Sequence, residues 1–276
     1  MFILSKYPLP TGHGLPKPDS PTPKTSNMRN PFLFLPLAAL AMSSVAQAIP
    51  VVVNNFSFET PSIASDGNFV VATGATGFDG WGYNKTTGSG FQDFGIENPS
   101  SAEYAGASGA GTPSGADGTN VAFLNQSIVG GITNIFQDVG TLQPNTKYTL
   151  TIAVGQRLDR TNGSLDIALF NTAAGSGLTG NPFTDVTSTL LNSTTGVSSV
   201  AGTFQDFSVI YTTGSIVTGD LTVGAQYTAD GTVQASLDNV RLDATAVPVP
   251  EPGSIPTLLG AFGIFLGFRL SRRHKI

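Results

Sequence analysis

The chain has 276 residues, no cysteine and two histidines, and its formal net charge at pH 7 is -5. Without cysteine, no disulfide can stabilise the fold and thiol chemistry is excluded. The excess of negative charge also disfavours binding to nucleic acid, so we expect no nucleic-acid partner.

The chain begins with a segment that has no pattern able to form a core. Residues 1–27 are rich in Pro, Ser, Thr and Lys. Such a composition predicts a disordered or non-native extension. The true start is either Met28, with the upstream stretch a gene-model artefact, or Met1, with an unusually long leader.

Residues 28–48 have the parts of a secretory signal peptide. Arg29 precedes an apolar run, and Ala46 and Ala48 form an Ala-x-Ala site. This order of a positive residue, an apolar region and small residues is typical of exported proteins. We therefore predict cleavage after Ala48 and export across the inner membrane.

Residues 49–246 form a body of suitable size for one domain with a continuous core. The body holds 16 of the acidic residues and 5 of the basic ones, so it is more acidic than the whole chain. Both histidines, His13 and His274, lie outside it. A Ser-His-Asp triad and an ordinary His-based zinc site are therefore excluded.

The body has the period-two alternation of half-buried strands, separated by turns rich in Gly, Asn, Asp and Thr. Strands are predicted over residues 51–58, 69–72, 121–124, 132–139, 148–154, 165–169, 207–211, 221–227 and 233–242. Residues 98–118 are poor in large apolar groups and are expected to form a surface loop. The pattern predicts an all-β fold, a single jelly-roll β-sandwich.

Several short motifs follow one another along the body, and their order indicates a known type of β-sandwich. They are residues 54–59 (Asn-Asn-Phe-Ser-Phe-Glu), 80–81 (Gly-Trp), 118–124, 135–139, 144–150 and 237–242 (Leu-Asp-Asn-Val-Arg-Leu). In this order the body resembles the galactose-binding-like jelly rolls, a superfamily that includes many carbohydrate-binding modules. The resemblance implies a glycan ligand and a structural calcium where the first and last strands meet.

The calcium site implied by this resemblance falls on Glu59 and Asp238, with Asn239 as a further oxygen donor. Calcium takes six to eight oxygen ligands, so backbone carbonyls would have to complete the site. The alternative is that these residues are turn or edge positions on an acidic surface.

The candidate sugar-binding residues are aromatic. Trp81, with Phe78 and Tyr83 among glycines, could present rings to the C–H face of a sugar, and Tyr104 and Arg157 are further candidates. The alternative for Trp81 is a core position, since a single Trp in a sandwich is often buried. For Tyr104 and Arg157 it is a solvated loop.

Catalysis is the other class of function to weigh. Without His or Cys in the body, the practical option is a carboxylate pair for glycoside hydrolysis, and no pair stands out. No nucleophile elbow or phosphate loop occurs. The sequence thus favours a non-catalytic protein that binds glycan or exopolysaccharide. The alternative is a structural or adhesive matrix protein with no discrete ligand.

The end of the chain, residues 247–276, has the pattern of a membrane anchor. An uncharged stretch is just long enough to span a bilayer, and we expect a transmembrane helix over residues 254–270. The basic cluster that follows, with Arg272 and Arg273, places the C-terminus on the cytoplasmic side. A buried core helix is the alternative.

Pro250, Glu251 and Pro252 precede this stretch. The motif, the short span and the Arg-Arg ending together resemble the PEP-CTERM sorting signal of bacteria that make extracellular polymer. The resemblance implies an exosortase as a partner, transient anchoring in the membrane, and a final place at the cell surface or outside the cell.

Overall fold

The computed structural model describes most of the predicted body. The residues described are 46–73, 77–86, 90–107, 111–160, 163–175, 181–229 and 233–249. Among them, no helix is long and apolar enough to cross a membrane. Residues 1–27, most of the signal peptide and the stretch predicted to span the membrane lie outside the described residues.

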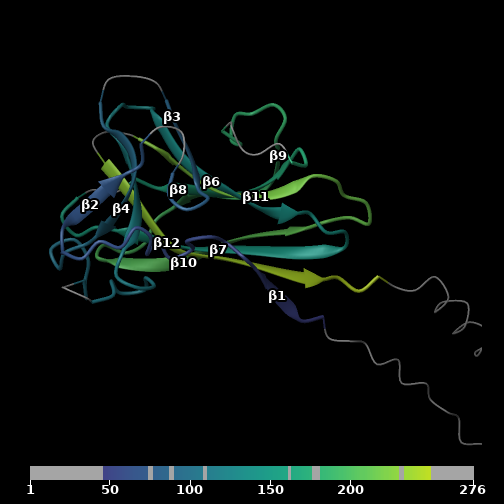
Figure 1. Cartoon of the computed structure of the whole chain (residues 1–276), viewed down its shortest axis with the longest axis horizontal. Helices are drawn as coiled ribbons and strands as arrows, with labels where there is room; N and C mark the ends of the chain where they lie inside the picture. Colours follow the sequence, from purple (N-terminus) through teal and green to yellow (C-terminus); the bar gives the residue numbers. More distant parts are fainter. Residues whose placement is uncertain are drawn as a thin grey trace, which may run out of the picture. The chain divides into compact units, whose positions relative to one another are not determined.

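The described chain forms two antiparallel sheets packed face to face, as Figure 1 shows. The larger sheet has the order β10-β7-β12-β5-β4-β2, and β1 pairs with β12. Its strands are β1 (Ala48–Val51), β2 (Asn68–Val71), β4 (Gln92–Asn98), β5 (Val121–Gln126), β7 (Thr146–Gln156), β10 (Thr203–Thr212) and β12 (Val233–Ala246). The smaller sheet has the order β3-β6-β11-β8-β9. Its strands are β3 (Gly82–Lys85), β6 (Ile132–Thr141), β8 (Leu165–Thr172), β9 (Thr189–Val197) and β11 (Asp220–Thr228). The expected all-β sandwich is confirmed.

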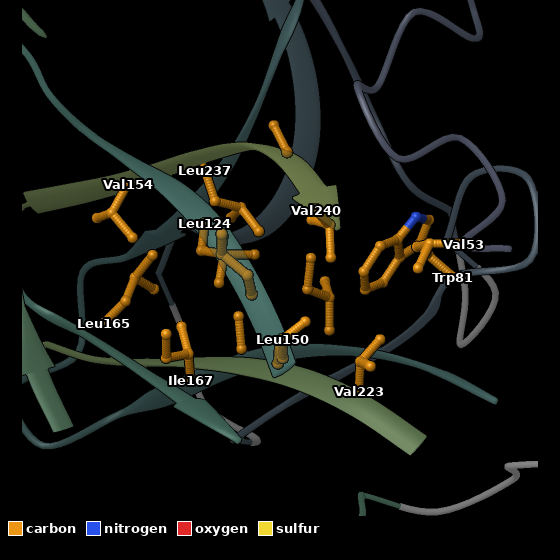
Figure 2. Close-up of a cluster of buried hydrophobic side chains, with 14 of the residues drawn as sticks. Val53, Trp81, Leu124, Leu150, Val154, Leu165, Ile167, Val223, Leu237 and Val240 are labelled. Carbon is orange, nitrogen blue, oxygen red and sulfur yellow. The ribbon is translucent and has the colours of Figure 1, made fainter. Parts of the chain in front are cut away.

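The core lies between the two sheets and follows from the alternation in the sequence. In β7, Leu150 and Val154 face inward, and in β8, Leu165 and Ile167 face them. Figure 2 shows these side chains pointing toward one another from the two layers. Each fully buried aliphatic side chain contributes about 1.5–3 kcal/mol, so this alternation supplies much of the driving force for folding.

The segment predicted as a strand over residues 51–58 is strand only at its start. β1 ends at Val51. Beyond it, Asn55 and Phe58 adopt positive φ angles of 46° and 53°. A left-handed conformation is incompatible with an extended strand, so the chain turns here instead.

A second, smaller cluster lies on the outer face of the larger sheet. The segment that was expected to be a surface loop covers this face, and its Tyr104 is fully buried. Tyr104 packs on Phe204 of β10, with ring centroids 4.8 Å apart. This loop is therefore anchored, and it fixes Glu103 beside the larger sheet.

Candidate active site

A cavity of about 360 Å³ opens on the outer face of the larger sheet. Side chains of β2, β4, β5 and β12 line it. The other lining residues include Arg157 and Arg160, which follow β7, and Glu103 of the anchored loop. The aromatic lining residues are Phe69, Phe91 and Phe123, and the charged ones are Asp93, Glu97, Glu103, Arg157 and Arg160. The cavity thus combines a few aromatic side chains with a larger number of polar and charged groups, and convergent polar groups in a concave site are typical of small-molecule binding.

The floor of the cavity depends on Gly95 in β4. A Cβ atom at this position would lie 2.1 Å from Cζ of Phe123 and 2.6 Å from the carbonyl oxygen of Val70. Glycine therefore lets the Phe123 ring lie flat on the sheet. The ring of Phe69 meets Phe123 edge-on, with centroids 5.9 Å apart.

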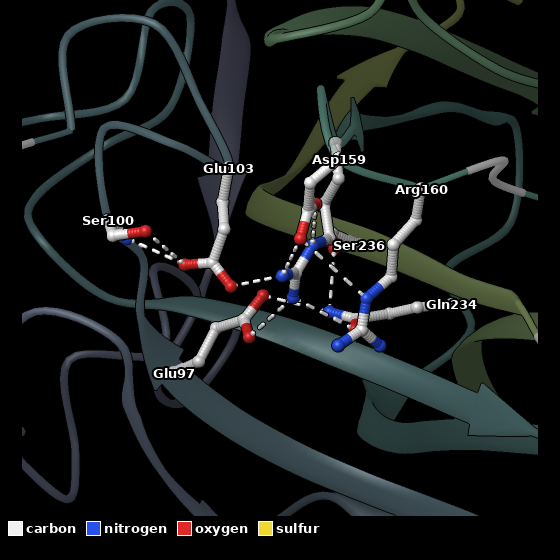
Figure 3. A network of polar contacts seen from close by, with 8 residues as sticks. Glu97, Ser100, Glu103, Asp159, Arg160, Gln234 and Ser236 are labelled. Carbon is white, nitrogen blue, oxygen red and sulfur yellow. Dashed lines mark hydrogen bonds and ion pairs between the residues drawn. The ribbon is translucent and has the colours of Figure 1, made fainter.

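One buried guanidinium organises the polar side of the cavity. Arg157, which follows β7, is 4% exposed and contacts three carboxylates. Its Nη1 is 3.3 Å from Glu97 Oε2, its Nε donates to Asp159 at 2.8 Å, and its Nη2 pairs with Glu103. Figure 3 shows the carboxylates of Glu97, Glu103 and Asp159 pointing toward one another.

The carboxylates are held by neighbours as well as by Arg157. Gln234 of β12 donates its Nε2 to Glu97 Oε1 at 2.8 Å. The backbone N–H and the hydroxyl of Ser100 donate to Glu103 Oε2 at 2.7 and 3.0 Å. Glu97 and Glu103 are therefore preorganised before any ligand enters.

Glu97 has the properties of a proton donor. It is 5% exposed, and burial raises the pKa of its carboxyl to about 7, against the lowering effect of Arg157. The negative charge of Glu103 raises the pKa further. Three carboxylates surround Arg157, and Arg160 is the nearest second cation, so a proton on Glu97 relieves the excess negative charge. A carboxyl that titrates near neutral pH is suited to acid–base catalysis.

The predicted sugar-binding aromatic residues do not form an exposed platform. Trp81 is 3% exposed and Tyr83 is 4% exposed, and Phe78 packs against the same core. Trp81 donates its Nε1 to the carbonyl of Asn54 at 3.0 Å, and the Tyr83 hydroxyl donates to the carbonyl of Gln92. Trp81 is therefore a core residue, as the alternative interpretation of the sequence had it.

The glycines near Trp81 serve close packing. A Cβ at Gly82 would lie 2.2 Å from Phe136, and one at Gly77 would lie 2.6 Å from Phe94. These positions let aromatic rings approach the backbone, and they do not expose Trp81.

The other two candidates, Tyr104 and Arg157, are also buried. Arg157 lines the cavity, whereas Tyr104 does not line it but lies close enough to Glu97 and Arg157 to be affected by their charges. The negative charge of Glu97 contributes to the raised pKa of Tyr104, after burial, which is the main cause. Sequence reasoning missed Glu97 itself. The alternate spacing of Asp93, Gly95 and Glu97, which places them on one face of β4, is the sequence pattern that could have indicated it.

The predicted calcium residues converge on a different part of the fold. Asp238 accepts a hydrogen bond from the backbone N–H of Asp117 at 2.6 Å, and Glu59 accepts from the N–H groups of Thr119 and Asn120 at 2.8 Å. Within the described residues, no three acidic, His or Cys residues gather as a metal site.

Two observations at this place nevertheless favour a cation. Asp238 Oδ1 and Asn120 Oδ1 are buried and, among the residues that the structure describes, have no hydrogen-bond partner. Burial also raises the pKa of Asp238 to about 8, and the nearby charges of Asp117 and Glu59 raise it further. Asn239, the third predicted ligand, is half-buried with a φ of 47°.

Comparison with known proteins identifies relatives of the whole sandwich. The model of the HpiC1-like family, described as HpiC1 cyclase, matches residues 49–243. The Stig cyclase FisC from Fischerella sp. TAU, solved with (3Z)-3-(1-methyl-2-pyrrolidinylidene)-3H-indole, is similar with a TM-score of 0.55 and 20% identity over 73% of this chain and 100% of that chain. A cyclase from Fischerella sp. TAU solved with 4-(1H-indol-3-yl)butan-2-one has a TM-score of 0.54 and 20% identity over 73% and 100%. No curated protein matches.

These comparisons correct several expectations from the sequence. The identification as a PEP-CTERM protein with a galactose-binding-like, carbohydrate-binding body is wrong, because the matched family is a cyclase family and covers the body. The non-catalytic, glycan-binding or matrix function is wrong for the same reason. The expected partners, exosortase and glycan, are wrong as well, since the ligands in the similar cyclase structures are indoles. Over residues 49–243, the chain belongs to the HpiC1-like family.

Proposed function

We propose that the protein is a cyclase that binds an indole-type substrate in the cavity on the larger sheet and closes a ring by proton transfer from Glu97. The observation that carries this proposal is a buried carboxyl, with a pKa of about 7, in a cavity walled by phenylalanines. The family match and the indoles bound by similar cyclases support it.

The reaction needs no external reagent. Glu97 gives its proton to an unsaturated position of the substrate, and an electron pair elsewhere in the substrate attacks the resulting cation and forms the ring bond. A proton then leaves the new ring and returns to the Glu97 carboxylate, so that the product is an isomer of the substrate. General acid–base catalysis of this kind contributes about 10²–10⁴-fold to a rate.

The neighbouring residues have distinct roles in this scheme. Arg157 stabilises the Glu97 carboxylate after the proton has left, since the two groups lie 3.3 Å apart. Gln234 fixes the Oε1 atom through its 2.8 Å hydrogen bond. Phe69 and Phe123 present their rings to the flat part of the substrate, and the faces of these rings stabilise the positive charge that develops on it.

The size of the cavity suits this class of substrate. Its volume of about 360 Å³ lies at the small end of the range for ligand sites, about 300–1,000 Å³. Such a volume accommodates a two-ring aromatic with a short side chain.

The experiment uses two variants and a matched control. Calorimetry with 4-(1H-indol-3-yl)butan-2-one is expected to show binding to the wild type and to Glu97→Gln, and weaker binding to Phe69→Ala. Isomerisation of 3-alkenyl indoles, followed by NMR, is expected in the wild type and lost in Glu97→Gln. Asp243→Asn, which removes a carboxylate that does not line the cavity, should behave as wild type. Absence of indole binding, or full turnover by Glu97→Gln, would overturn the proposal.

We also propose that one structural calcium ion binds between Glu59 and Asp238. The unpartnered oxygens of Asp238 and Asn120 would be ligands, with Asn239 and backbone carbonyls able to complete the set. A ligand bound only by the native state must stabilise it. Millimolar calcium should therefore raise the melting temperature of the wild type and not that of Asp238→Asn. Equal melting temperatures in calcium and in EGTA would rule the ion out.

We further propose a jelly-roll connectivity and export of the protein. Successive strands from β5 to β8, and again from β9 to β12, alternate between the two sheets, which supports a jelly roll. The signal-peptide pattern before Ala48 supports export. Sequencing the N-terminus of the mature protein tests export. A mature protein that still begins at Met28 would contradict it.

A further inference from the structure

Among the described lining residues, Asp93 is the one carboxylate that neither takes part in the proposed chemistry nor contacts Arg157. It is half-buried in β4, lines the cavity, and pairs across the strands with Asn125 of β5. Within the described residues Asp93 makes no ion pair, whereas Glu97 and Glu103 both contact Arg157. A lining carboxylate left without a cation favours a positively charged ligand.

The whole cavity has an excess of negative charge. Its ionisable groups are the carboxylates Asp93, Glu97 and Glu103 and the guanidinium groups of Arg157 and Arg160, with Asp159 bound to Arg157 from outside the lining. Even with Glu97 protonated, three carboxylates face two guanidinium groups. An excess of one sign of charge in a cavity attracts a ligand of the opposite sign.

The aromatic walls favour the same charge. Phe69 is 62% exposed and Phe91 is 74% exposed, and both line the cavity with Asp93. The face of an aromatic ring attracts a cation by about 0.5–2 kcal/mol. Exposed phenylalanines beside an unpaired carboxylate form a suitable site for an ammonium or iminium group.

We propose that the substrate of this cavity is a nitrogen base attached to an aromatic ring and bound as its cation, with the charged nitrogen between Asp93 and the phenylalanine faces. This inference rests on the proposed function and names its substrate class. Asp93 and Glu97 lie four residues apart on β4, ~13 Å at ~3.3 Å per residue, so the charged nitrogen and the reacting position are different parts of the substrate. The cation stays at Asp93, while the Glu97 proton goes to an unsaturated carbon elsewhere in the substrate. The ring bond then forms and a proton returns to the Glu97 carboxylate, so atoms and charge balance.

The test compares three indoles of similar size and different charge. Tryptamine is a cation, 3-propylindole is neutral and indole-3-propionate is an anion at neutral pH. Calorimetry with the wild type should show tryptamine binding about tenfold tighter than 3-propylindole, a ratio that corresponds to ~1.4 kcal/mol. The anion should bind most weakly, and added salt should reduce the preference for tryptamine.

Variants assign the preference to Asp93. Asp93→Asn should weaken tryptamine about tenfold and leave 3-propylindole within about twofold, whereas Asp93→Glu should keep the preference. Asp243→Asn makes the same change of charge away from the cavity and should have no effect. The melting temperature of each variant shows whether it is folded.

The outcomes separate the two proposals. If 3-propylindole binds as tightly as tryptamine, or if Asp93→Asn keeps the preference for the cation, the substrate class is wrong and the aromatic site remains. If none of the three indoles binds to the wild type, both the substrate class and the proposed function are overturned.

Discussion

Replacing Glu97 by glutamine should change how stability depends on pH. In the folded protein burial raises the pKa of Glu97 from 4.5 to about 7. Between these two values the folded state binds more protons than the unfolded state, so stability falls as pH rises. The stabilising contribution of the protonated form is complete below pH ~4.5 and is lost as pH passes ~7.

The magnitude follows from the same pKa values. Each pKa unit corresponds to ~1.4 kcal/mol, so ionising Glu97 costs the folded state about 3 kcal/mol above neutral pH. Glutamine has the shape of the protonated side chain and does not titrate. Glu97→Gln should therefore equal the wild type in stability near pH ~4.5 and exceed it by about 3 kcal/mol near pH ~8.5.

Urea unfolding of both proteins across this pH range measures the difference. Other titrating groups, including Asp238, occur in both proteins and cancel when the two profiles are subtracted. Parallel profiles would show that Glu97 ionises normally and would refute the argument that it is a proton donor at neutral pH. A shift of about 3 kcal/mol is a large part of the stability of a domain, so it is measurable.

Three further predictions concern the glycine floor, the core and the calcium site. Gly95→Ala should destabilise the fold by about 1–3 kcal/mol and weaken indole binding, since its Cβ would lie 2.1 Å from Phe123. Thermal melting measures the loss of stability and calorimetry the loss of binding. Unchanged binding would contradict the role of Gly95 in the cavity floor. Trp81→Phe should lower the melting temperature, because the hydrogen bond to Asn54 is lost, and should leave indole binding unchanged. Weaker indole binding by a folded variant would mean that Trp81 is part of the site. Burial raises the pKa of Asp238 to about 8, so its protonation stabilises the fold at low pH and this stability is lost as pH rises through 8. Urea unfolding should show this fall in stability in EGTA and a smaller fall in calcium. An equal dependence of stability on pH in the two conditions would contradict the metal site.

Most of the fold could be predicted from the sequence, because the central strands obey one rule. β7, β8 and β11 alternate large apolar and small or polar residues, and the structure buries the apolar face of each. β9 was missed because it lies at an edge of the smaller sheet and is mostly exposed on both faces. A strand without a buried face has no alternation to detect.

The site was harder to predict because its residues are far apart in sequence. Glu97 and Gln234, which share a hydrogen bond, are separated by 137 positions, and Glu97 and Arg157 by 60. No short motif contains them. Sequence reasoning selected Arg157 and Tyr104 as sugar-binding candidates, with a solvated loop as the alternative, whereas the structure buries both.

Two buried carboxyls of this sandwich show how the surroundings of an acid decide its use. Burial raises the pKa of both Asp238 and Glu97. Within the described residues, Asp238 faces backbone N–H groups and unpartnered oxygens and has no ion pair with Arg or Lys, so only a proton or a metal ion can balance its charge. Glu97 is already balanced in part by Arg157, and it faces a cavity. A metal ion there would meet the guanidinium at close range, whereas a proton can leave and return at little cost. Calcium should therefore leave the titration of Glu97 unchanged while it suppresses that of Asp238, and the pH profile of Glu97→Gln against wild type should be the same in calcium and in EGTA.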